Sequence, residues 1–517
     1  MLVKIKGSAL LGIEAIPITI EINVSMGQGY SIVGLPDSSI KESLDRTESA
    51  LKANGFHMPR TKILVNLSPA DLKKTGAAFD LPIAIGLIAA SEQLISQIPL
   101  HQLLIMGELG LDGFLYPIKG ALAMAQQAKL EGLAALILPV ENVREASIIE
   151  GVAIYGFSHL KELVHFLQTG TNENSYSSFI KPYELPISKE QAMPKFEDIK
   201  GQEHCKRALA IASAGGHNLI MIGPPGAGKT MLAKSIVSIL PPLNTKEAIE
   251  TMQIYSASNK VNMANQLSYV RPFRQPHHTI SSIAMIGGGS YPQPGEISLA
   301  HNGVLFLDEL PEFNRNVIEV LRQPMEEGKA HIARAKMNLV FPASFMLIAA
   351  MNPCPCGYFN HPFKDCTCSA PSIQKYMHKI SGPLLDRIDL HIEVAPLSYQ
   401  KLIAPAIGSN ADHILTLVIM ARKIQSERLN KDELGLTNAQ MNRTQLKQYC
   451  NLDKESANLL ENAMEKFQLS VRSHDRIIKV ARTIADMANS KMIDATHVSE
   501  AIQYRCLDRS SWGTLKA

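Results

Sequence analysis

The chain has 517 residues, of which 46% are hydrophobic and 19% charged, and 51 basic against 48 acidic residues give a formal net charge of +3. This near balance excludes a protein that binds nucleic acid through bulk charge, so any such surface must be local. No apolar run reaches the length of a membrane span, and seven cysteines in a chain of this size do not indicate a secreted disulfide framework. We therefore predict a cytoplasmic globular protein of about three domains, without a membrane partner.

Residues 1–168 predict a mixed α+β domain, because alternating apolar runs indicate strands and helix-like spacings follow them. The stretch 107–122 resembles the part of Lon proteases that leads to the catalytic lysine, and 74–81 resembles the part that carries their nucleophile. Ala78 and Leu122 stand at the matching positions, and neither side chain can act as a nucleophile or a base. The resemblance implies a Lon-protease-like domain (ribosomal S5 domain 2-like) without peptidase activity.

A phosphate-binding loop follows a linker. Residues 169–193 are polar and show no periodic pattern, which predicts the linker. Further on, Gly223-x4-Gly228-Lys229-Thr230 follows an apolar run and fits the pattern G-x-x-x-x-G-K-[ST]. Such loops surround phosphates with backbone N–H groups, the lysine adds positive charge, and the Thr hydroxyl is a ligand for Mg²⁺. We predict a nucleoside triphosphate site formed by Gly223, Pro224, Pro225, Gly226, Ala227, Gly228, Lys229 and Thr230.

Two later apolar strands end in polar residues suited to hydrolysis. The run 303–307 ends in Asp308 and Glu309, where Asp308 is suited to hold Mg²⁺ and Glu309 to take a proton from the attacking water. The run 345–351 ends in Asn352, which fits a water-orienting residue and also a turn before proline. Ligands bind at the carboxyl ends of strands in open α/β sheets, so we expect these side chains near the phosphate loop.

Four of the seven cysteines form two pairs, Cys354-Pro-Cys356 and Cys366-Thr-Cys368, nine residues apart. Four thiolates on a turn-rich loop fit a tetrahedral structural Zn²⁺, although C-x-C pairs chelate less readily than C-x-x-C pairs. The alternative is four reduced, unliganded cysteines, which would invite oxidation. We predict that zinc bound by all four thiols cross-links this loop and has a structural role.

Residues 396–517 are almost entirely helical in pattern, and Ile477, Val480, Ile484 and Met487 form one apolar stripe. Together with the preceding motifs this resembles the AAA+ ATPases, with an ATPase core at 194–395 and a helical lid at 396–517. The resemblance also implies an adenine pocket lined by Ile199 and Gly201.

Three arginines receive roles only from this resemblance. Arg387, in the stretch 381–390, matches an arginine finger that reaches the γ-phosphate bound by the neighbouring subunit. Arg472 matches the sensor 2 residue of the lid, with Arg476 as the alternative. Without the family, Arg387 is part of a surface ion pair and the other two are exposed helix residues.

Two insertions indicate which subfamily of AAA+ proteins the chain resembles. The segment 271–301 precedes the acidic strand end, and 327–341 predicts a hairpin before Asn352; both are typical of the helix-2-insert group of AAA+ proteins. The whole chain resembles the ComM/YifB family. That family implies a homo-hexameric ATPase using ATP and Mg²⁺, which drives DNA branch migration in natural transformation, with other recombination proteins as further partners. Branched or single-stranded DNA would be contacted through its phosphates by Lys329, His331, Arg334 and Lys336, although these residues also fit a solvated hairpin.

Two other classes of function stay open. One is a chelatase-type motor that remodels a protein partner such as a metal-inserting enzyme, which leaves residues 1–168 unexplained. The other is a Lon-like protease, which Ala78 and Leu122 disfavour; Ser68 and Lys73 are conceivable substitutes but fit a solvated turn better.

Overall fold

The computed structural model describes residues 1–170, 194–258, 268–289, 292–334, 337–396, 411–429, 436–505 and 507. The chain forms two compact units: Met1–Pro186 with Thr245–Ser268, and Ile187–Asn244 with Tyr269–Ala517. They are called here the N-terminal and the C-terminal unit. Most of the predicted linker, 171–193, lies outside the described residues.

The N-terminal unit is built on a seven-stranded mixed sheet. The long strands β1 (Leu2–Leu11) and β2 (Glu14–Ser25) pair antiparallel, and β4 (Lys62–Ser68) pairs antiparallel with β2. The remaining neighbours run parallel. The order is β3-β4-β2-β1-β5-β8-β9, and the other strands are β3 (Tyr30–Val33), β5 (Leu103–Ile105), β8 (Ala135–Pro139) and β9 (Ala153–Phe157).

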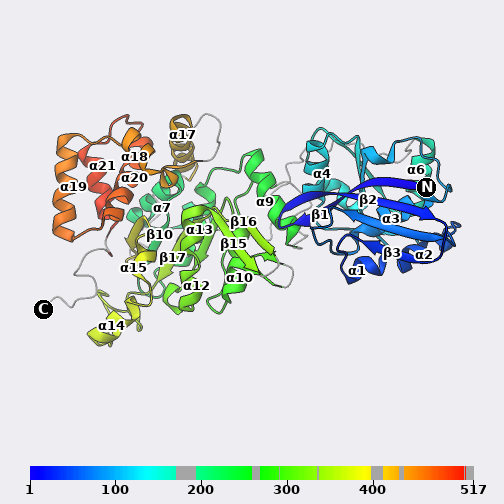
Figure 1. The fold of residues 1–517 in the computed structure, drawn as a ribbon. Coiled ribbons are helices and arrows are strands. Elements are labelled where there is room, and N and C mark those ends of the chain that lie inside the picture. Colours follow the sequence, from blue (N-terminus) through cyan, green and yellow to red (C-terminus); the bar gives the residue numbers. More distant parts are fainter. Residues whose placement is uncertain are drawn as a thin grey trace. The chain divides into compact units, whose positions relative to one another are not determined.

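Helices pack on this sheet (Figure 1). Every residue of α3 (Asp80–Ala90) is buried, because its side chains are apolar on all sides apart from Asp80. Asp80 itself is paired with Arg46 at 2.7 Å. The other helices are α1 (Ser38–Lys41), α2 (Ser43–Ala53), α4 (Ala121–Leu130), α5 (Val140–Ala146) and α6 (Leu160–Thr169).

One further helix of this unit comes from the middle of the chain. Helix α9 (Thr245–Ala257) follows the phosphate-loop helix in sequence, yet Met252 is 5% exposed and belongs to the core of the N-terminal unit. The hydroxyl of Ser256 donates to Glu145 at 2.5 Å, and Glu145 also accepts the N–H of Leu122 at 3.1 Å. Burial raises the pKa of Glu145. The N-terminal unit thus includes residues from the sequence of the ATPase core.

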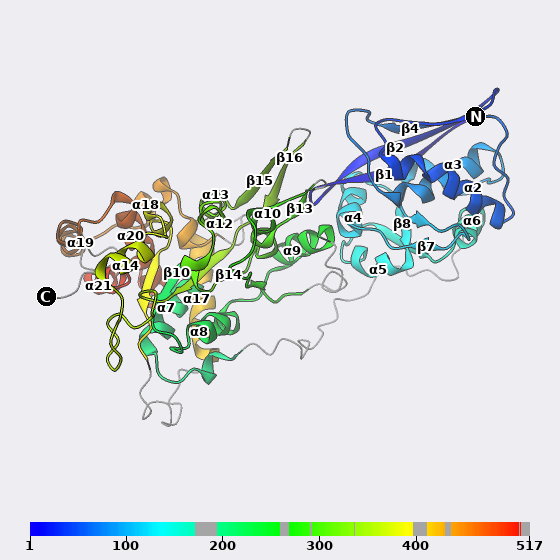
Figure 2. The same cartoon turned by 90° about the horizontal axis from the view of Figure 1, so that it is seen from below.

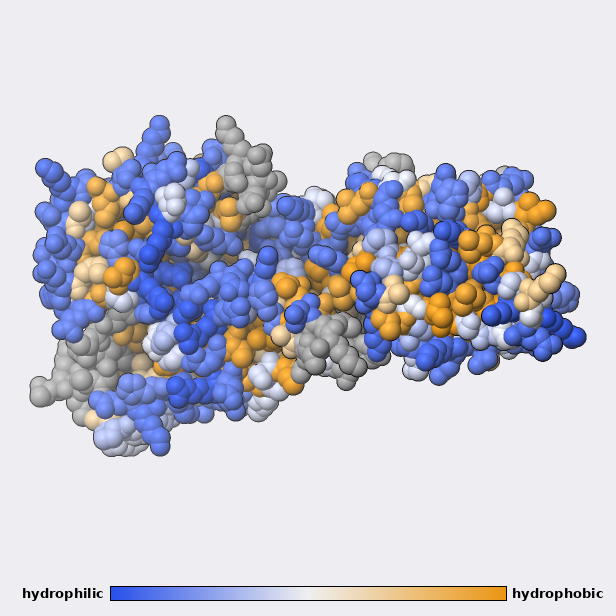
Figure 3. Space-filling model, in the orientation of Figure 1, coloured by the Kyte–Doolittle hydropathy of each residue, from blue (hydrophilic) through white to orange (hydrophobic). Residues whose placement is uncertain are grey.

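The surface of the N-terminal unit carries apolar residues at several places on the face shown in Figure 3. Leu111, Phe114 and Tyr116, on and beside the short hairpin β6 (Glu108–Leu109) and β7 (Leu115–Tyr116), are among its exposed side chains.

The C-terminal unit is built on a five-stranded parallel sheet, in the order β11-β14-β17-β10-β18. All residues of β10, β14 and β17 are buried, as expected for parallel strands covered by helices on both faces. The carboxyl ends of these strands therefore meet at one edge of the sheet. The strands are β10 (Leu219–Ile222), β11 (Phe273–Arg274), β14 (Val304–Leu307), β17 (Met346–Met351) and β18 (Leu390–Glu393).

Helices and two hairpins surround this sheet. The hairpin of β15 (Lys329–Arg334) and β16 (Met337–Pro342) projects from the body of the unit (Figure 2). The smaller hairpin of β12 (Gly287–Gly288) and β13 (Gln293–Pro294) contacts β15. The helices are α7 (Glu203–Gly215), α8 (Lys229–Ser235), α10 (Ser282–Ile286), α11 (Glu296–Leu299), α12 (Arg315–Glu319), α13 (Arg322–Glu327), α14 (Ala370–Met377) and α15 (Gly382–Leu385).

The described residues between 411 and 505 are mainly helical, as predicted. The stripe of Ile477, Val480, Ile484 and Met487 is buried along α20 (Val471–Met487), which packs on α7 and α21. Within the described ranges, no helix is both long and apolar enough to cross a lipid bilayer. The other helices are α17 (Ala411–Leu429), α18 (Arg443–Tyr449), α19 (Lys454–Phe467) and α21 (Ala495–Gln503). The mixed α/β fold, with a parallel sheet and a terminal helical region, has the predicted AAA+ architecture.

Candidate nucleotide-binding site

The predicted phosphate loop connects the buried strand β10 to helix α8. Gly226 and Gly228 have φ angles of +76° and +87°, in the left-handed region that favours glycine. A Cβ at Gly223 would lie 2.3 Å from the carbonyl oxygen of Val394, so the loop's first residue must also be glycine. Helix α8 begins at Lys229, directly after the loop.

Lys229 lies across this loop. Its ammonium group donates to the carbonyl oxygens of Gly223 at 2.7 Å and Pro224 at 3.0 Å, and to Oδ1 of Asn352 at 3.1 Å. Burial lowers the pKa of Lys229, and the nearby Asp308 and Glu309 oppose this change. A buried cation held by neutral oxygens is well placed to exchange them for a phosphate.

The acidic strand end meets the loop at Thr230, whose hydroxyl donates to Oδ2 of Asp308 at 2.8 Å. A hydroxyl and a carboxylate this close are a suitable pair of oxygen ligands for Mg²⁺. Glu309 has a left-handed φ of +53°, its N–H donates to Oδ1 of Asp308 at 3.1 Å, and its side chain is exposed. This turn separates the two acids, so that Asp308 faces the phosphate loop and Glu309 faces solvent.

Asn352 joins the same cluster from the end of β17, since it accepts from Lys229. The structure thus brings Lys229, Thr230, Asp308 and Asn352 together at the carboxyl edge of the sheet. Ile199, predicted for the adenine pocket, is 6% exposed, and Gly201 is left-handed with a φ of +59°.

Arg387 lies at the opposite edge of the sheet. Strands β10 and β18 are parallel with Leu219 beside Leu390 and Ile222 beside Glu393, so the residues before Leu390 lie at the amino end of β10. The side-chain amide of Asn218 donates to the carbonyl oxygen of Arg387 at 3.1 Å, which fixes this position. The phosphate loop begins at the other end of β10, roughly 10 Å of strand away.

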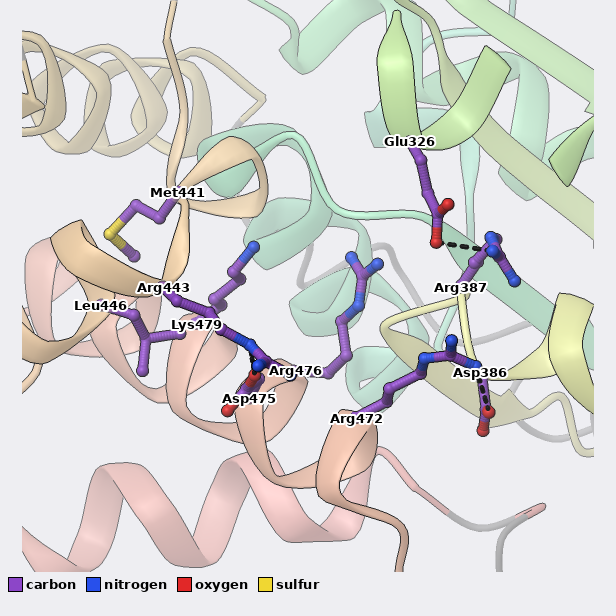
Figure 4. A pocket seen from close by; sticks show the side chains of 10 residues that line it. All are labelled: Glu326, Asp386, Arg387, Met441, Arg443, Leu446, Arg472, Asp475, Arg476 and Lys479. Atoms are coloured by element: carbon purple, nitrogen blue, oxygen red, sulfur yellow. Dashed lines mark ion pairs between the residues drawn. The ribbon is translucent and has the colours of Figure 1, made fainter. Parts of the chain in front are cut away.

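A cavity of about 150 Å³ lies beside Arg387 (Figure 4). The Arg387 side chain is 8% exposed, pairs with Glu326 at 2.5 Å and donates to the carbonyl oxygen of Pro383 at 2.6 Å. Its buried Nε lacks a hydrogen-bond partner among the described residues. Five of the lining side chains are basic and three acidic: Arg387, Arg443, Arg472, Arg476, Lys479, Glu326, Asp386 and Asp475. The cavity therefore favours an anion.

The two lid arginines differ in their surroundings. Arg472 is 61% exposed at its side chain and lies 3.7 Å from Asp386. Arg476 pairs at 2.9 Å with Asp389, which is fully buried. Burial alone would raise the pKa of Asp389, but the nearby Arg476 and His217 hold this pKa far below its ordinary value. Arg476 thus connects the lid to the core through a buried ion pair, whereas the exposed side chain of Arg472 is accessible to a ligand.

Asp389 also connects β10 with the lid through His217. The ring of His217 is fully buried, with Nδ1 3.2 Å from Asp389 and Nε2 2.8 Å from the hydroxyl of Thr483 in α20. His217, Asp389 and Glu326 belong to no motif that the sequence displays. In the structure, Asp386 and Asp389 pair with Arg472 and Arg476, and the matching short spacings of the two acids and the two arginines are the signal that the sequence offers.

The four predicted cysteine ligands form one cluster, with all sulfur atoms within 4.8 Å of one another. Three of the Sγ–Sγ distances are 3.3, 3.6 and 3.7 Å, and a tetrahedral zinc with bonds of ~2.3 Å requires ~3.8 Å. Desolvation raises the pKa of the Cys356 thiol, but hydrogen bonds from the backbone at Tyr358 and from Cys354 outweigh it and lower this pKa to about 6. These donors fit Zn²⁺ in number, type and spacing.

The residues predicted to contact DNA lie on the projecting hairpin. Lys329 begins β15, and His331 has an exposed side chain 3.0 Å from Glu327. Lys336 and the side chain of Arg334 lie outside the part of the chain that the structure describes. The rings of His277 and His278 lie against each other, with centres 4.1 Å apart and planes tilted by 35°, and His277 is hydrogen bonded to the hydroxyl of Thr279.

Comparison with known proteins agrees with this geometry. Residues 195–402 match the family described as "Magnesium chelatase, subunit ChlI", 408–505 match its C-terminal part, and 20–142 match "Subunit ChlI of Mg-chelatase". Fold and site therefore define a P-loop protein of the AAA+ class, of the magnesium-chelatase type, and this class implies ATP and Mg²⁺.

Full-length relatives narrow the assignment. The chain is 43% identical over 507 residues to "Competence protein ComM" of Haemophilus influenzae, covering 97% of both chains. It is 42% identical over 505 residues to "Uncharacterized protein YifB" of Escherichia coli, covering 97% of this chain and 96% of the relative. The magnesium-chelatase subunit ChlI of Bigelowiella natans matches only 32% of this chain, at 27% identity. The chain belongs to the ComM/YifB family.

Proposed function

We propose that this protein is an ATP-driven motor that assembles as a homo-hexameric ring and moves branched DNA during homologous recombination. The proposal of a ring rests on the position of Arg387, which lies at the amino end of the parallel strands, opposite to the phosphate loop of its own subunit. An arginine so placed serves a nucleotide bound by the next subunit. The name of the Haemophilus relative, a competence protein, supports a role in the integration of DNA taken up in natural transformation.

Hydrolysis follows from the residues at the carboxyl edge. Thr230 and Asp308 would hold Mg²⁺, which supplies charge neutralisation for the β- and γ-phosphates. Lys229 exchanges its carbonyl partners for phosphate oxygens, and Asn352, released from Lys229, orients the attacking water. The exposed carboxylate of Glu309 takes the proton from that water.

Arg387 of the neighbouring subunit stabilises the charge that develops on the transferred phosphoryl group. Arg472 is the second γ-phosphate contact, because Arg476 is engaged by the buried Asp389. Glu326 holds Arg387 until a phosphate replaces its carboxylate.

DNA contact is assigned to the hairpin of β15 and β16. Lys329, His331, Arg334 and Lys336 from six subunits would line a pore, so a chain of small net charge can still bind the phosphate backbone. Such contacts do not depend on sequence and weaken with salt. Other recombination proteins are further partners, and we place the protein in the cytoplasm, because seven cysteines in a chain of 517 residues do not indicate a secreted disulfide framework. The four-cysteine loop binds a structural Zn²⁺.

A chelatase-type motor acting on a protein partner is the second candidate, because the matching family descriptions name that enzyme's subunit. A peptidase is disfavoured, since Leu122 is fully buried and aliphatic where Lon proteases place their lysine.

The deciding experiment compares ATP hydrolysis without DNA, with duplex DNA and with four-way junctions, at low and high salt. We expect junctions to stimulate hydrolysis, and Glu309→Gln to abolish it while ATP binding persists. The Lys329→Ala variant should hydrolyse ATP at the basal rate with a weaker response to DNA. If none of the DNAs changes the rate of ATP hydrolysis, and the protein binds no DNA at low salt, the chelatase-type motor would be favoured.

A further inference from the structure

The four-cysteine loop packs directly against the phosphate loop. Its first ligand, Cys354, follows Asn352 by two residues, and Gly357 turns the chain with a φ of +83°. A Cβ at Gly357 would lie 2.6 Å from Cδ of Pro225 and 3.9 Å from Cγ of Asn352. The cysteine loop is therefore one wall of the nucleotide site.

The far end of the same loop returns to Asn352. Helix α14 begins two residues after Cys368, and the backbone of Asn352 is hydrogen bonded to the hydroxyl of Tyr376 in that helix. Burial raises the pKa of Tyr376, and the hydrogen bond with the backbone of Asn352 opposes this change. Asn352 is thus attached to the cysteine loop on both sides, by the chain itself and by Tyr376.

The loop has little apolar core of its own. Cys354, Phe359 and Ile373 are its buried apolar residues, and the other three cysteines and Met377 pack partly buried against them. The N–H of Phe359 donates to the sulfur of Cys354 at 3.3 Å, so the sulfur cluster is also the centre of this small core. A core of this size needs a cross-link to hold one conformation.

We propose that Zn²⁺ bound by Cys354, Cys356, Cys366 and Cys368 is a structural element of the ATP site. By fixing Gly357 against Pro225, and α14 against the backbone of Asn352, the metal holds both the phosphate loop and the water-orienting amide. Loss of the metal weakens nucleotide binding and slows hydrolysis, so the metal state of the loop regulates the motor. This inference rests on the proposed ATP site and does not depend on DNA.

The test uses the full-length protein without DNA. The double variant Cys366→Ser/Cys368→Ser removes the two ligands farthest in sequence from Asn352, and Cys450→Ser, a buried thiol of the helical region, is the matched control. Zinc content, the affinity for a fluorescent ATP analogue and amide hydrogen exchange of residues 223–230 are measured for each. We expect about one zinc per chain in the wild type and in the control. The double variant should hold none, bind the nucleotide about tenfold more weakly, equal to ~1.4 kcal/mol, and exchange faster in the phosphate loop.

A second variant acts on the contact and leaves the thiols intact. Gly357→Ala places a methyl group against Pro225, so it should retain zinc and still bind nucleotide more weakly. Nucleotide affinity equal to the wild type in Gly357→Ala, or in a folded zinc-free double variant, would overturn the proposal, as would a zinc-free wild type. A wild type that binds no ATP would instead refute the proposed nucleotide site.

Discussion

The guanidinium of Arg387 lies 2.5 Å from the carboxylate of Glu326, in the last turn of α13. Three residues after Glu326 the projecting hairpin begins at Lys329. A phosphate from a neighbouring subunit would compete with Glu326 for Arg387. Exchange of this one ion pair would therefore carry the nucleotide state of one subunit to the hairpin of the next.

The shared site makes a prediction for mixed rings. Arg387→Ala and Lys229→Ala should each lower ATP turnover by on the order of 10³-fold, because each removes a different half of every interface. A mixture of the two variants contains interfaces with both halves intact and should recover part of the activity. Steady-state hydrolysis across mixing ratios measures this. A mixture that exchanges subunits but stays inactive would argue against an arginine supplied by the neighbour.

The pair of Arg387 and Glu326 predicts a response to anions. Glu326→Gln leaves Arg387, which is 7% exposed, without its counter-ion, while the half-exposed carboxylate limits the cost through solvent screening. We expect the free energy of unfolding to fall by about 1 kcal/mol, and sulfate to restore it by occupying the cavity. Thermal unfolding with and without sulfate tests this, with Glu327→Gln as the control for general salt effects. Equal gains in both variants would mean that the cavity does not bind anions.

The two lid arginines should separate into a functional and a structural residue. Arg472→Ala should lower the rate of hydrolysis and leave stability within about 0.5 kcal/mol, since its ion pair is exposed. Arg476→Ala leaves the buried Asp389 without its strongest partner and should destabilise the protein by about 3 kcal/mol. Urea unfolding and hydrolysis rates of both variants are the measurements, and the reverse pattern would exchange the two roles.

Lys479 predicts how stability changes with pH. Burial and the nearby Arg476 lower its pKa from 10.5 to about 8, so the unfolded chain binds a proton more tightly between these values. The cost of burying the charge is fully present below pH 8 and disappears as the pH rises toward 10.5. Lys479→Met should therefore be more stable than the wild type near pH 7, by about 2 kcal/mol, with a difference that shrinks by pH 10. Lys447→Met, at an exposed position of α18, should show no such trend.

The strands and the phosphate loop could be predicted because each is a local pattern, an apolar run that ends in glycines or acids. The four cysteines were equally visible, since their spacing in sequence already brings the thiols together. Glu326 and Asp389 could not be found in this way, because their partners are 61 and 87 residues away in the chain. The contact between Gly357 and Pro225 likewise depends on how two loops fold against each other, which composition and periodicity do not encode.

Helix α9 has a consequence for how the chain is made. The apolar core of the N-terminal unit includes Met252, and the hydrogen bonds of the buried Glu145 include Ser256. A ribosome that has released only the first 170 residues has therefore not delivered all of this unit. Its last piece arrives after the phosphate loop has been translated, so the beginning of the protein must wait for its middle before its folding is complete.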